Sequence, residues 1–270
     1  MLAARVIPCL DIKDGRVVKG VRFQELRDAG DPVENAAAYE EQGADEIILL
    51  DVSATPEDRG NAVETVRAVR SVLSIPLTVG GGVRRESDAG RLLDAGADKV
   101  GVNTAAVSRP DLVAEIASRF GSQCTVLAVD AAFRATPPVI GTYRGHIRTP
   151  VSQLRGGWEV VVQSGANRTG LDVVEWCRKA TALGAGEILL TSWDRDGTRD
   201  GYDVDLIAAV SGAVTVPVIA SGGAARPEHL IAALRAGASA ALVASILHDG
   251  DTTVADLKLA LSRAGITVRR

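Results

Sequence analysis

The chain has 270 residues, a formal net charge of −4 and 3% aromatic residues. A hydrophobic fraction of 46% allows a sizeable core, whereas the lack of basic patches with interleaved aromatic residues argues against nucleic-acid binding. No apolar run approaches the length of a membrane span. Charges within the first dozen residues argue against a secretory signal peptide. We therefore expect a soluble, cytoplasmic protein.

The cysteines and histidines suggest neither disulfides nor a metal. Cys9, Cys124 and Cys177 are widely spaced and odd in number, so we expect buried, reduced thiols. The chain has three scattered histidines and contains neither a CxxC pair nor an HExxH motif. We expect no metal and no other cofactor.

Strand-like apolar runs alternate with helix-like segments along the whole chain. The apolar runs predict strands over residues 5–11, 46–51, 76–80, 98–102, 124–130, 187–191, 217–221 and 239–243. The segments between them predict helices over residues 31–42, 60–73, 85–95, 109–119, 171–183, 203–212, 227–236 and 252–264. Strands that are apolar on both faces are typical of a parallel sheet covered by helices.

Local signals support several of these helix boundaries. Asp31-Pro32 offers an N-cap followed by a proline at the first helical position, and Arg109-Pro110 does so more weakly. Glycines follow four of the predicted helices, as C-terminal caps should: Gly43, Gly96, Gly184 and Gly237.

The chain also repeats itself. Gly43 and Gly184, Gly82 and Gly223, and Gly96 and Gly237 lie in similar segments and are each separated by 141 residues. Eight strand–helix units with such a two-fold repeat predict one closed (β/α)₈ barrel, the TIM barrel, over residues 1–270. A period this long indicates a duplicated half-barrel and not a solenoid.

One region interrupts the repeat. Asp11 and Asp130 close the first strand of each half but are only 119 residues apart, so about 22 residues are inserted after Asp130. We place the insertion at about 131–157. Residues 139–147 and 158–163 predict either a hairpin or a mobile loop over the barrel mouth, or a surface insertion without a role.

Asp11 and Asp130 are the strongest candidates for catalysis. Each ends an apolar strand, although aspartate is depleted in strands. In a TIM barrel the active site lies at the carboxyl ends of the strands, and strands 1 and 5 face each other across it. The pair suits acid and base catalysis, although both could instead cap the following turns.

Two glycine-rich turns suggest phosphate binding. Gly80-Gly81-Gly82 ends strand 3 and Gly222-Gly223 ends strand 7, where glycine lets backbone amides approach an anion. A short turn or helix follows the next strand in each half, as at the phosphate sites of such barrels. The matching positions are Gly82, Asn103 and Thr104 for one site and Gly223, Ala244 and Ser245 for the other. We therefore expect a substrate with a phosphate at each end.

Two further segments are weaker candidates. Gly197, in the turn Asp194–Thr198, could donate its amide to the second phosphate, although such charged turns are often only solvated; the counterpart is Thr55–Asp58. Lys19, in the long loop after strand 1, either closes over a phosphate or an anionic intermediate or is an ordinary surface lysine.

The opposite ends of the strands carry unusual charges. Arg5, Glu46, Lys99 and Glu187 begin strands 1, 2, 4 and 6. We expect these residues to ring the floor of the barrel, where they could form ion pairs and close an opening.

Several motifs closely resemble the cyclase subunit of imidazole glycerol phosphate synthase, over nearly the whole chain. They are Ile7–Asp11, Gly15–Gly20, Leu26–Pro32, Leu77–Gly82, Gly96–Val100 and Asp194–Thr198. The resemblance implies an enzyme of histidine biosynthesis that uses ammonia and a bis-phosphorylated ribulosyl-formimino-aminoimidazole carboxamide ribonucleotide. The implied products are imidazole glycerol phosphate and an aminoimidazole carboxamide ribonucleotide.

The resemblance also implies roles for individual residues. Asp11 and Asp130 would be the general acid and base. One phosphate would be held by Gly82, Asn103 and Thr104, and the other by Asp196, Gly197, Gly223, Ala244 and Ser245. Ammonia would come from a glutaminase subunit, which forms a heterodimer at the N-terminal barrel face, through a gate made of Arg5, Glu46, Lys99 and Glu187.

Three features depart from the family pattern: the long insertion after Asp130, Trp193 in place of an aliphatic residue, and the Ser164–Arg168 loop. Two alternatives remain open on sequence grounds. One is the phosphoribosylformimino isomerase of the same pathway, and Cys9, Lys19 and the charged floor argue against it. The other is a non-catalytic phosphate-binding barrel, and the aspartate pair argues against that.

Overall fold

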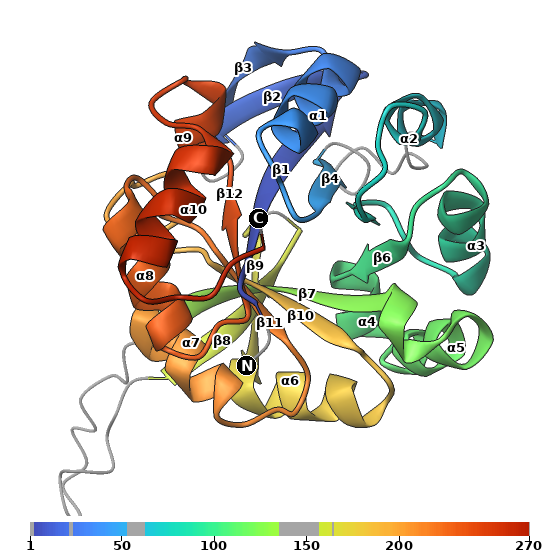
Figure 1. The fold of residues 1–270 in the computed structure, drawn as a ribbon. Coiled ribbons are helices and arrows are strands. Elements are labelled where there is room, and N and C mark those ends of the chain that lie inside the picture. Colours follow the sequence, from blue (N-terminus) through green and yellow to red (C-terminus); the bar gives the residue numbers. More distant parts are fainter. Residues whose placement is uncertain (1–2, 22–23, 53–62, 135–156, 164, 270) are drawn as a thin grey trace, which may run out of the picture.

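The computed structural model describes residues 3–21, 24–52, 63–134, 157–163 and 165–269. Within these ranges, eight parallel strands close into a barrel and helices surround it (Figure 1). The strands are β1 (Arg5–Lys13), β4 (Ile47–Asp51), β5 (Leu77–Gly80), β6 (Lys99–Val102), β7 (Thr125–Arg134), β10 (Glu187–Ser192), β11 (Val218–Ser221) and β12 (Ala240–Val243). The expected (β/α)₈ fold is confirmed.

One helix follows each barrel strand on the outside of the barrel. These helices are α1 (Pro32–Glu41), α2 (Val63–Arg70), α3 (Glu86–Asp94), α5 (Asp111–Phe120), α6 (Val173–Ala182), α7 (Val204–Ser211), α8 (Pro227–Arg235) and α10 (Val254–Arg263). The shorter elements are α4 (Thr104–Ser108), α9 (Ser245–His248) and a 3₁₀ turn, Ser122–Cys124.

The barrel closes because both of its last edges find a parallel partner. β7 pairs with β10, with Asp130 opposite Thr191, and β12 pairs with β1, with Ala240 opposite Arg5. A closed barrel leaves no strand of its own unpaired and brings all eight carboxyl ends to one face.

Two hydrophobic layers hold this arrangement together. Val6 and Leu10 of β1 face the helices, whereas Ile7 and Cys9 face inward, as strand alternation requires. The inward layer contains Ile7, Cys9, Ile48, Val126, Leu189, Ile219, Ala240 and Leu242. This plug separates the floor of the barrel from its mouth.

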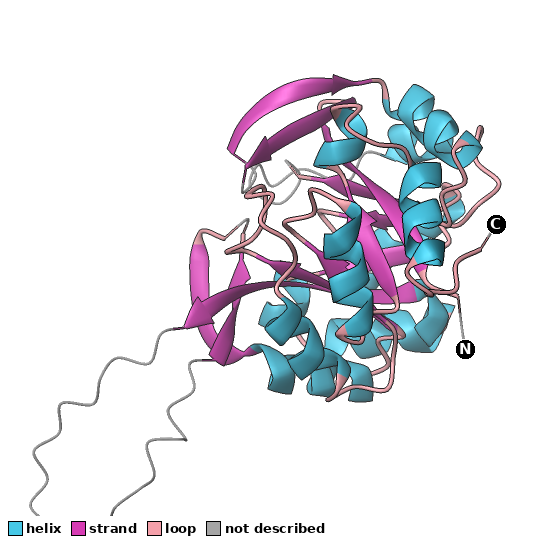
Figure 2. Cartoon of the chain, turned by 60° about the vertical axis from the view of Figure 1, so that its left-hand side comes forward, coloured by secondary structure: helices cyan, strands magenta, loops and turns pink. Residues whose placement is uncertain are grey.

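Two antiparallel hairpins extend the barrel at its mouth (Figure 2). The first comprises β2 (Arg16–Val21) and β3 (Gln24–Gly30), and the second comprises β8 (Gly157–Val162) and β9 (Asn167–Asp172). β2 pairs with β1, and β8 pairs with β7. The expected hairpin strand at 158–163 is thus present, whereas 139–147 and the counterpart turn Thr55–Asp58 lie outside the described residues.

These hairpins correct two predictions. The first strands of each half do not end at the aspartates, since β1 continues to Lys13 and β7 to Arg134. The segment after β1 is not a loop but a hairpin. Both strands continue because, past the aspartates, an antiparallel partner satisfies the backbone amides and carbonyls that would otherwise be unpaired.

Side-chain caps account for several of the helix starts in the described part of the chain. The Asp31 side chain accepts from the amides of Val33 and Glu34 at 2.8 and 3.2 Å, as the Asp-Pro signal predicts. Pro110 was expected at the first helical position of α5, but it is the N-cap residue, one position earlier. The predicted start of α6 at 171 is two residues early, since β9 includes Asp172, which then caps the helix.

The two ends of the described chain meet at the floor. Ala4 forms a parallel bridge with Val268, and its amide donates to the Thr267 carbonyl at 2.8 Å. Both ends lie on the side of the molecule opposite the hairpins (Figure 2). Within the described ranges, no helix is both long and apolar enough to cross a membrane.

The three cysteines are free thiols. Cys9 and Cys177 are buried as expected, but Cys124 is partly exposed at the start of β7. The prediction that all three are buried is therefore wrong for Cys124, because it belongs to a 3₁₀ turn at the surface and not to the strand interior.

Candidate active site

Asp11 and Asp130 occupy equivalent places at the barrel mouth. Asp11 lies opposite Leu50 of β4 and Val18 of β2. Asp130 lies opposite Thr191 of β10 and Val161 of β8. Each carboxylate therefore lies where a strand leaves the barrel and enters a hairpin.

The surroundings of Asp11 favour its protonated form. Burial raises the pKa of its carboxyl to about 7, and the nearby charge of Asp196 adds to the rise, whereas the Cys9 thiol lowers it. The Cys9 sulfur lies 3.6 Å from Oδ1 of Asp11. Burial also raises the pKa of this thiol well above its usual range, so Cys9 stays protonated and serves as a weak donor.

The pKa of Asp130 is raised to a similar value by a different set of contacts. Burial raises the pKa of its carboxyl to about 7, the side-chain amide of Asn103 opposes this by donating at 2.9 Å, and the charge of Asp196 raises it further. Near neutral pH each aspartate can therefore be either charged or neutral. That is the condition for a group that gives or takes a proton during turnover.

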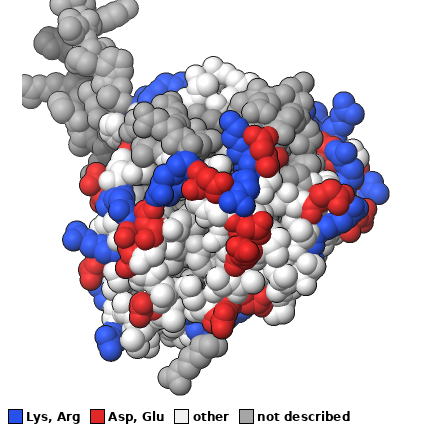
Figure 3. Space-filling view, turned by 90° about the horizontal axis from the view of Figure 1, so that it is seen from above, with Lys and Arg blue, Asp and Glu red and all other residues white. Residues whose placement is uncertain are grey.

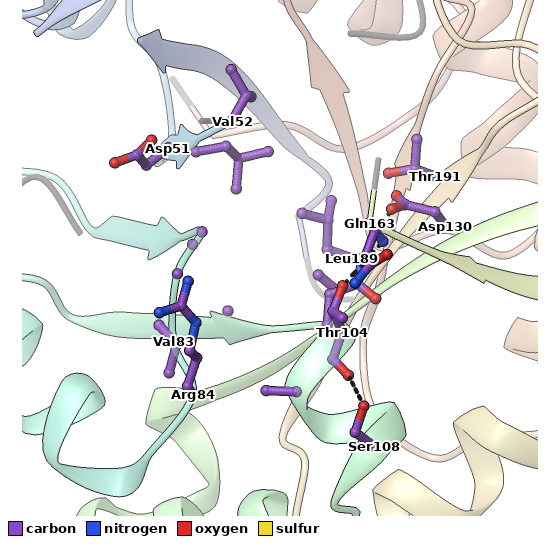
Figure 4. A pocket seen from close by; sticks show the side chains of 18 of the residues that line it. Asp51, Val52, Val83, Arg84, Thr104, Ser108, Asp130, Gln163, Leu189 and Thr191 are labelled. Atoms are coloured by element: carbon purple, nitrogen blue, oxygen red, sulfur yellow. Dashed lines mark hydrogen bonds between the residues drawn. The ribbon is translucent and has the colours of Figure 1, made fainter. Parts of the chain in front are cut away.

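A cavity of about 470 Å³ opens beside Asp130. In Figure 4, Asp51 and Arg84 lie on one side of it, and Asp130, Gln163 and Thr191 on the other. The volume suits a small-molecule ligand. The predicted phosphate-binding residues Gly82, Asn103 and Thr104 all line this cavity.

The glycine turn below this cavity tolerates only glycine. Gly81 and Gly82 have φ angles of +94° and +68°. A β-carbon on Gly81 would lie 2.2 Å from the Asp51 carbonyl oxygen. The backbone of β5 therefore passes directly beside that of β4, which leaves the turn free of side chains toward the cavity.

A second, smaller space lies beside Asp11. It is lined by Asp11 together with five of the predicted phosphate-site residues: Asp196, Gly197, Gly223, Ala244 and Ser245. Leu50 and Thr191 line both this space and the larger cavity, so the two spaces are adjacent at those residues. Each space thus contains one of the two candidate catalytic aspartates and one glycine turn.

The two spaces also match in backbone geometry. Gly222 and Gly223 have φ angles of +92° and +99°. The N-cap of α4, Asn103, has φ −131° and ψ −97°, and the N-cap of α9, Ala244, has φ −130° and ψ −77°. Equivalent turns followed by equivalent short helices support the inferred duplication, which stays a prediction.

The structure also places the charged floor. Arg5 pairs with Glu46 at 2.8 Å and with Glu187, and Lys99 pairs with the same two carboxylates at 2.8 and 2.7 Å. Thr78 donates to Glu46 at 2.5 Å. Burial lowers the pKa of Arg5, but the two carboxylates outweigh this and raise it. The four charges form a closed ring below the hydrophobic plug.

The sequence did not single out three residues of the mouth. Asp51 ends β4 and is buried, and Arg84 follows the glycine turn. Gln163 has a φ of +54°, and its backbone N–H donates a hydrogen bond to the Thr104 hydroxyl oxygen at 3.2 Å. Asp51 could have been recognised from its strand-end position, but Gln163 reaches the site only through the second hairpin.

Two departures from the family pattern contact each other. The indole of Trp193 fills the space that a side chain at Gly165 would need. A β-carbon added to Gly165 would lie 2.1 Å from the indole ring. Gly165 has a φ of +78°. Trp193 therefore packs against the turn of the second hairpin and ties it to the end of β10.

A family model described as "Histidine biosynthesis protein" matches residues 5–253. Within the described part of the chain, no three histidine, cysteine or acidic side chains are grouped as a metal site would require. Because the family model matches most of the chain, the chain is a member of the histidine biosynthesis protein family. It is a barrel enzyme with two adjacent spaces at its mouth.

A particular relative narrows this assignment. The chain is 53% identical over 268 residues to the imidazole glycerol phosphate synthase subunit HisF of Nocardia farcinica (strain IFM 10152), covering 99% of both chains. The chain belongs to the HisF family, the cyclase subunits of imidazole glycerol phosphate synthase, and is an enzyme of histidine biosynthesis. This relationship favours the cyclase over the isomerase and the non-catalytic barrel.

Proposed function

We propose that this barrel converts the bis-phosphorylated ribulosyl-formimino-aminoimidazole carboxamide ribonucleotide and ammonia into imidazole glycerol phosphate and aminoimidazole carboxamide ribonucleotide, in the cytoplasm. The observation that supports this most directly is the pairing of two half-sites, each with one of the candidate catalytic aspartates and one glycine turn, which are adjacent at Leu50 and Thr191. A substrate with two phosphates would span both half-sites and place its reactive middle between Asp11 and Asp130.

The phosphates would bind mainly to backbone amides. Short turns that open helices present unpaired amides to an anion. One phosphate would bind at Gly82, Asn103 and Thr104. The other would bind at Gly197, Gly223, Ala244 and Ser245, with Asp196 orienting that turn and Lys19 adding a positive charge.

Asp11 and Asp130 would exchange the protons. Ammonia attacks the ketone carbon of the ribulosyl chain, and two of its protons move to the ketone oxygen, which leaves as water and gives an imine; the neutral carboxyl gives a proton to this oxygen and the ionised one takes a proton from the nitrogen. The imine nitrogen then attacks the formimino carbon and closes the ring, and the bond from that carbon to the nitrogen of the aminoimidazole ribonucleotide breaks. The departing nitrogen receives the remaining proton of the imine nitrogen and one proton from the ribulosyl CH₂ carbon, which leaves an aromatic imidazole. Two carboxyl groups with a pKa of about 7 can be in opposite states at neutral pH.

Ammonia would enter from the floor. We propose that a glutaminase subunit docks on the N-terminal face as the partner in a heterodimer. The ring of Arg5, Glu46, Lys99 and Glu187 would then be its gate, since these side chains close the barrel axis below the plug. Passage would require at least one ion pair of the ring to open.

The test is turnover of the purified chain with this substrate and ammonium salt at alkaline pH, followed by loss of substrate absorbance. We expect turnover that depends on ammonia. Conversion of the ribosyl precursor without ammonia would instead assign the isomerase reaction, and no reaction with either compound would leave a binding barrel. Adding a glutaminase subunit and glutamine in place of ammonium then tests the partner.

A further inference from the structure

Three cationic side chains converge on an acidic pair directly after α9. Asp249, the C-cap residue of α9, accepts hydrogen bonds from Lys19 and Arg27, and Arg199 lies 3.6 Å from the same carboxylate. Arg199 also pairs with Asp251. On the side of the molecule that carries the first hairpin, acidic and basic side chains lie next to one another (Figure 3). Asp249 is thus a shared anion for cations from different segments.

Two of these cations come from the first hairpin. Lys19 of β2 and Arg27 of β3 are opposite each other in the strand register, so their side chains leave the same face of the hairpin. β2 pairs with β1 only as far as Val18. Beyond that residue the barrel no longer supports the hairpin through backbone pairing, and side-chain contacts to α9 take over.

The helix that carries Asp249 is itself well anchored. The His248 ring contacts the Tyr39 hydroxyl at 2.7 Å and the Cys9 carbonyl at 3.0 Å, which joins α9 to α1 and β1. Ile246 and Leu247 of α9 are buried. Asp249 is therefore a fixed point, and the hairpin is the part whose position depends on the contact.

The contact also lies beside the second half-site. Lys19 lines a small space together with Asp11, Asp196, Gly197 and Ser245. Its ammonium lies 3.4 Å from the Ser245 carbonyl oxygen, and its side chain is only 16% exposed. Lys19 is thus held next to the turn at which we place the second phosphate.

We propose that Asp249 is a positioning residue that holds Lys19 and Arg27, and through them the first hairpin, over the second half-site before substrate binds. This role rests on the proposed function, which places a phosphate there. The incoming phosphate shares or takes over Lys19, while Arg27 keeps the hairpin on Asp249. Without Asp249, substrate would have to order the hairpin itself, which weakens binding.

The first experiment measures amide hydrogen exchange in the ligand-free protein. We expect Asp249→Asn to speed exchange in β2 and β3 about tenfold and to leave the barrel strands unchanged. Asp251→Asn is the matched control. It removes the same charge two residues further along the chain, and the Asp251 carboxylate pairs with Arg199 and not with the hairpin. Unchanged exchange in Asp249→Asn would overturn the proposal.

The second experiment measures cyclase kinetics with saturating ammonia. We expect Asp249→Asn to raise KM for the bis-phosphorylated substrate about tenfold while kcat stays within about threefold, and Asp249→Glu to restore most of the loss. Faster exchange with an unchanged KM would refute the link to phosphate binding. Absence of turnover in the unaltered chain would refute the proposed function alone, because the exchange experiment needs no substrate.

Discussion

The mouth and the floor of this barrel use acidic residues in opposite ways. At the floor, Glu46 and Glu187 each contact both Arg5 and Lys99, so their charges are balanced by hydrogen-bonded cations. At the mouth, burial and the neighbouring Asp196 raise the pKa of Asp11 and Asp130 to about 7. Since both sets lie at an opening of the barrel, the neighbouring charges distinguish the carboxylates that pair with cations from those whose pKa is raised to about 7.

Removing charge at the mouth tests this contrast most strongly. We expect Asp11→Asn and Asp130→Asn each to lower kcat by about 10³-fold or more, because an amide cannot exchange the proton, with KM changed only several-fold. Steady-state kinetics with ammonium salts would measure this. Asp205→Asn, on the exposed surface of α7, is the matched control. Near-normal rates in both single variants would reject the acid and base roles.

Removing charge at the floor should lower the free energy of unfolding, because the floor carboxylates balance two partly buried cations. Glu46→Gln leaves Arg5 and Lys99 with one shared carboxylate, and breaking such a buried pair costs about 3 kcal/mol or more of unfolding free energy. Urea denaturation would measure the loss. Glu64→Gln removes a solvent-exposed partner of Arg67 and should change stability by less than about 1 kcal/mol. Equal losses in the two variants would contradict the contrast.

The same variants at the mouth should gain stability at alkaline pH. Because the pKa of each aspartate is raised from its usual 3.8 to about 7 in the folded chain, stability falls as pH rises from about 4 to 7, where only the unfolded chain has lost the proton. The cost is complete above about pH 7 and absent well below pH 4, where the carboxyl is protonated in both states. We expect each Asn variant to be more stable by about 1–3 kcal/mol at pH 8, since solvent in the cavity reduces the full effect. The gain should shrink steadily as the pH is lowered from 7 and vanish at about pH 3, as thermal melts across pH would show.

The sequence located the residues whose face of the barrel follows from the direction of the predicted strands. Asp11, Asp130, the glycine turns and the charged floor could be located because a parallel barrel gathers all carboxyl ends on one face and all amino ends on the other. Knowing the strands was therefore enough to sort these residues by face. The aspartates and the glycine turns line two adjacent spaces at the mouth, and their roles in substrate binding and catalysis stay predictions.

What the sequence did not predict depends on contacts between distant segments. The first hairpin reads as a loop because charged residues and glycines interrupt its apolar residues, and β2 becomes part of the sheet by pairing with β1 and β3. Asp249 reads as an ordinary turn residue, since its partners in the hairpin, Lys19 and Arg27, are more than 200 residues away. Gln163 enters the site only through the register of β8 with β7.

The bridge between Ala4 and Val268 has a practical consequence for assembling the enzyme. Because both ends of the chain emerge at the floor, a protein fused to either end through a short flexible linker would face the floor at an effective concentration in the millimolar range. A fused glutaminase would then be held beside the charged ring even if its affinity for the barrel were weak. A bulky purification tag at the same ends would compete for that surface.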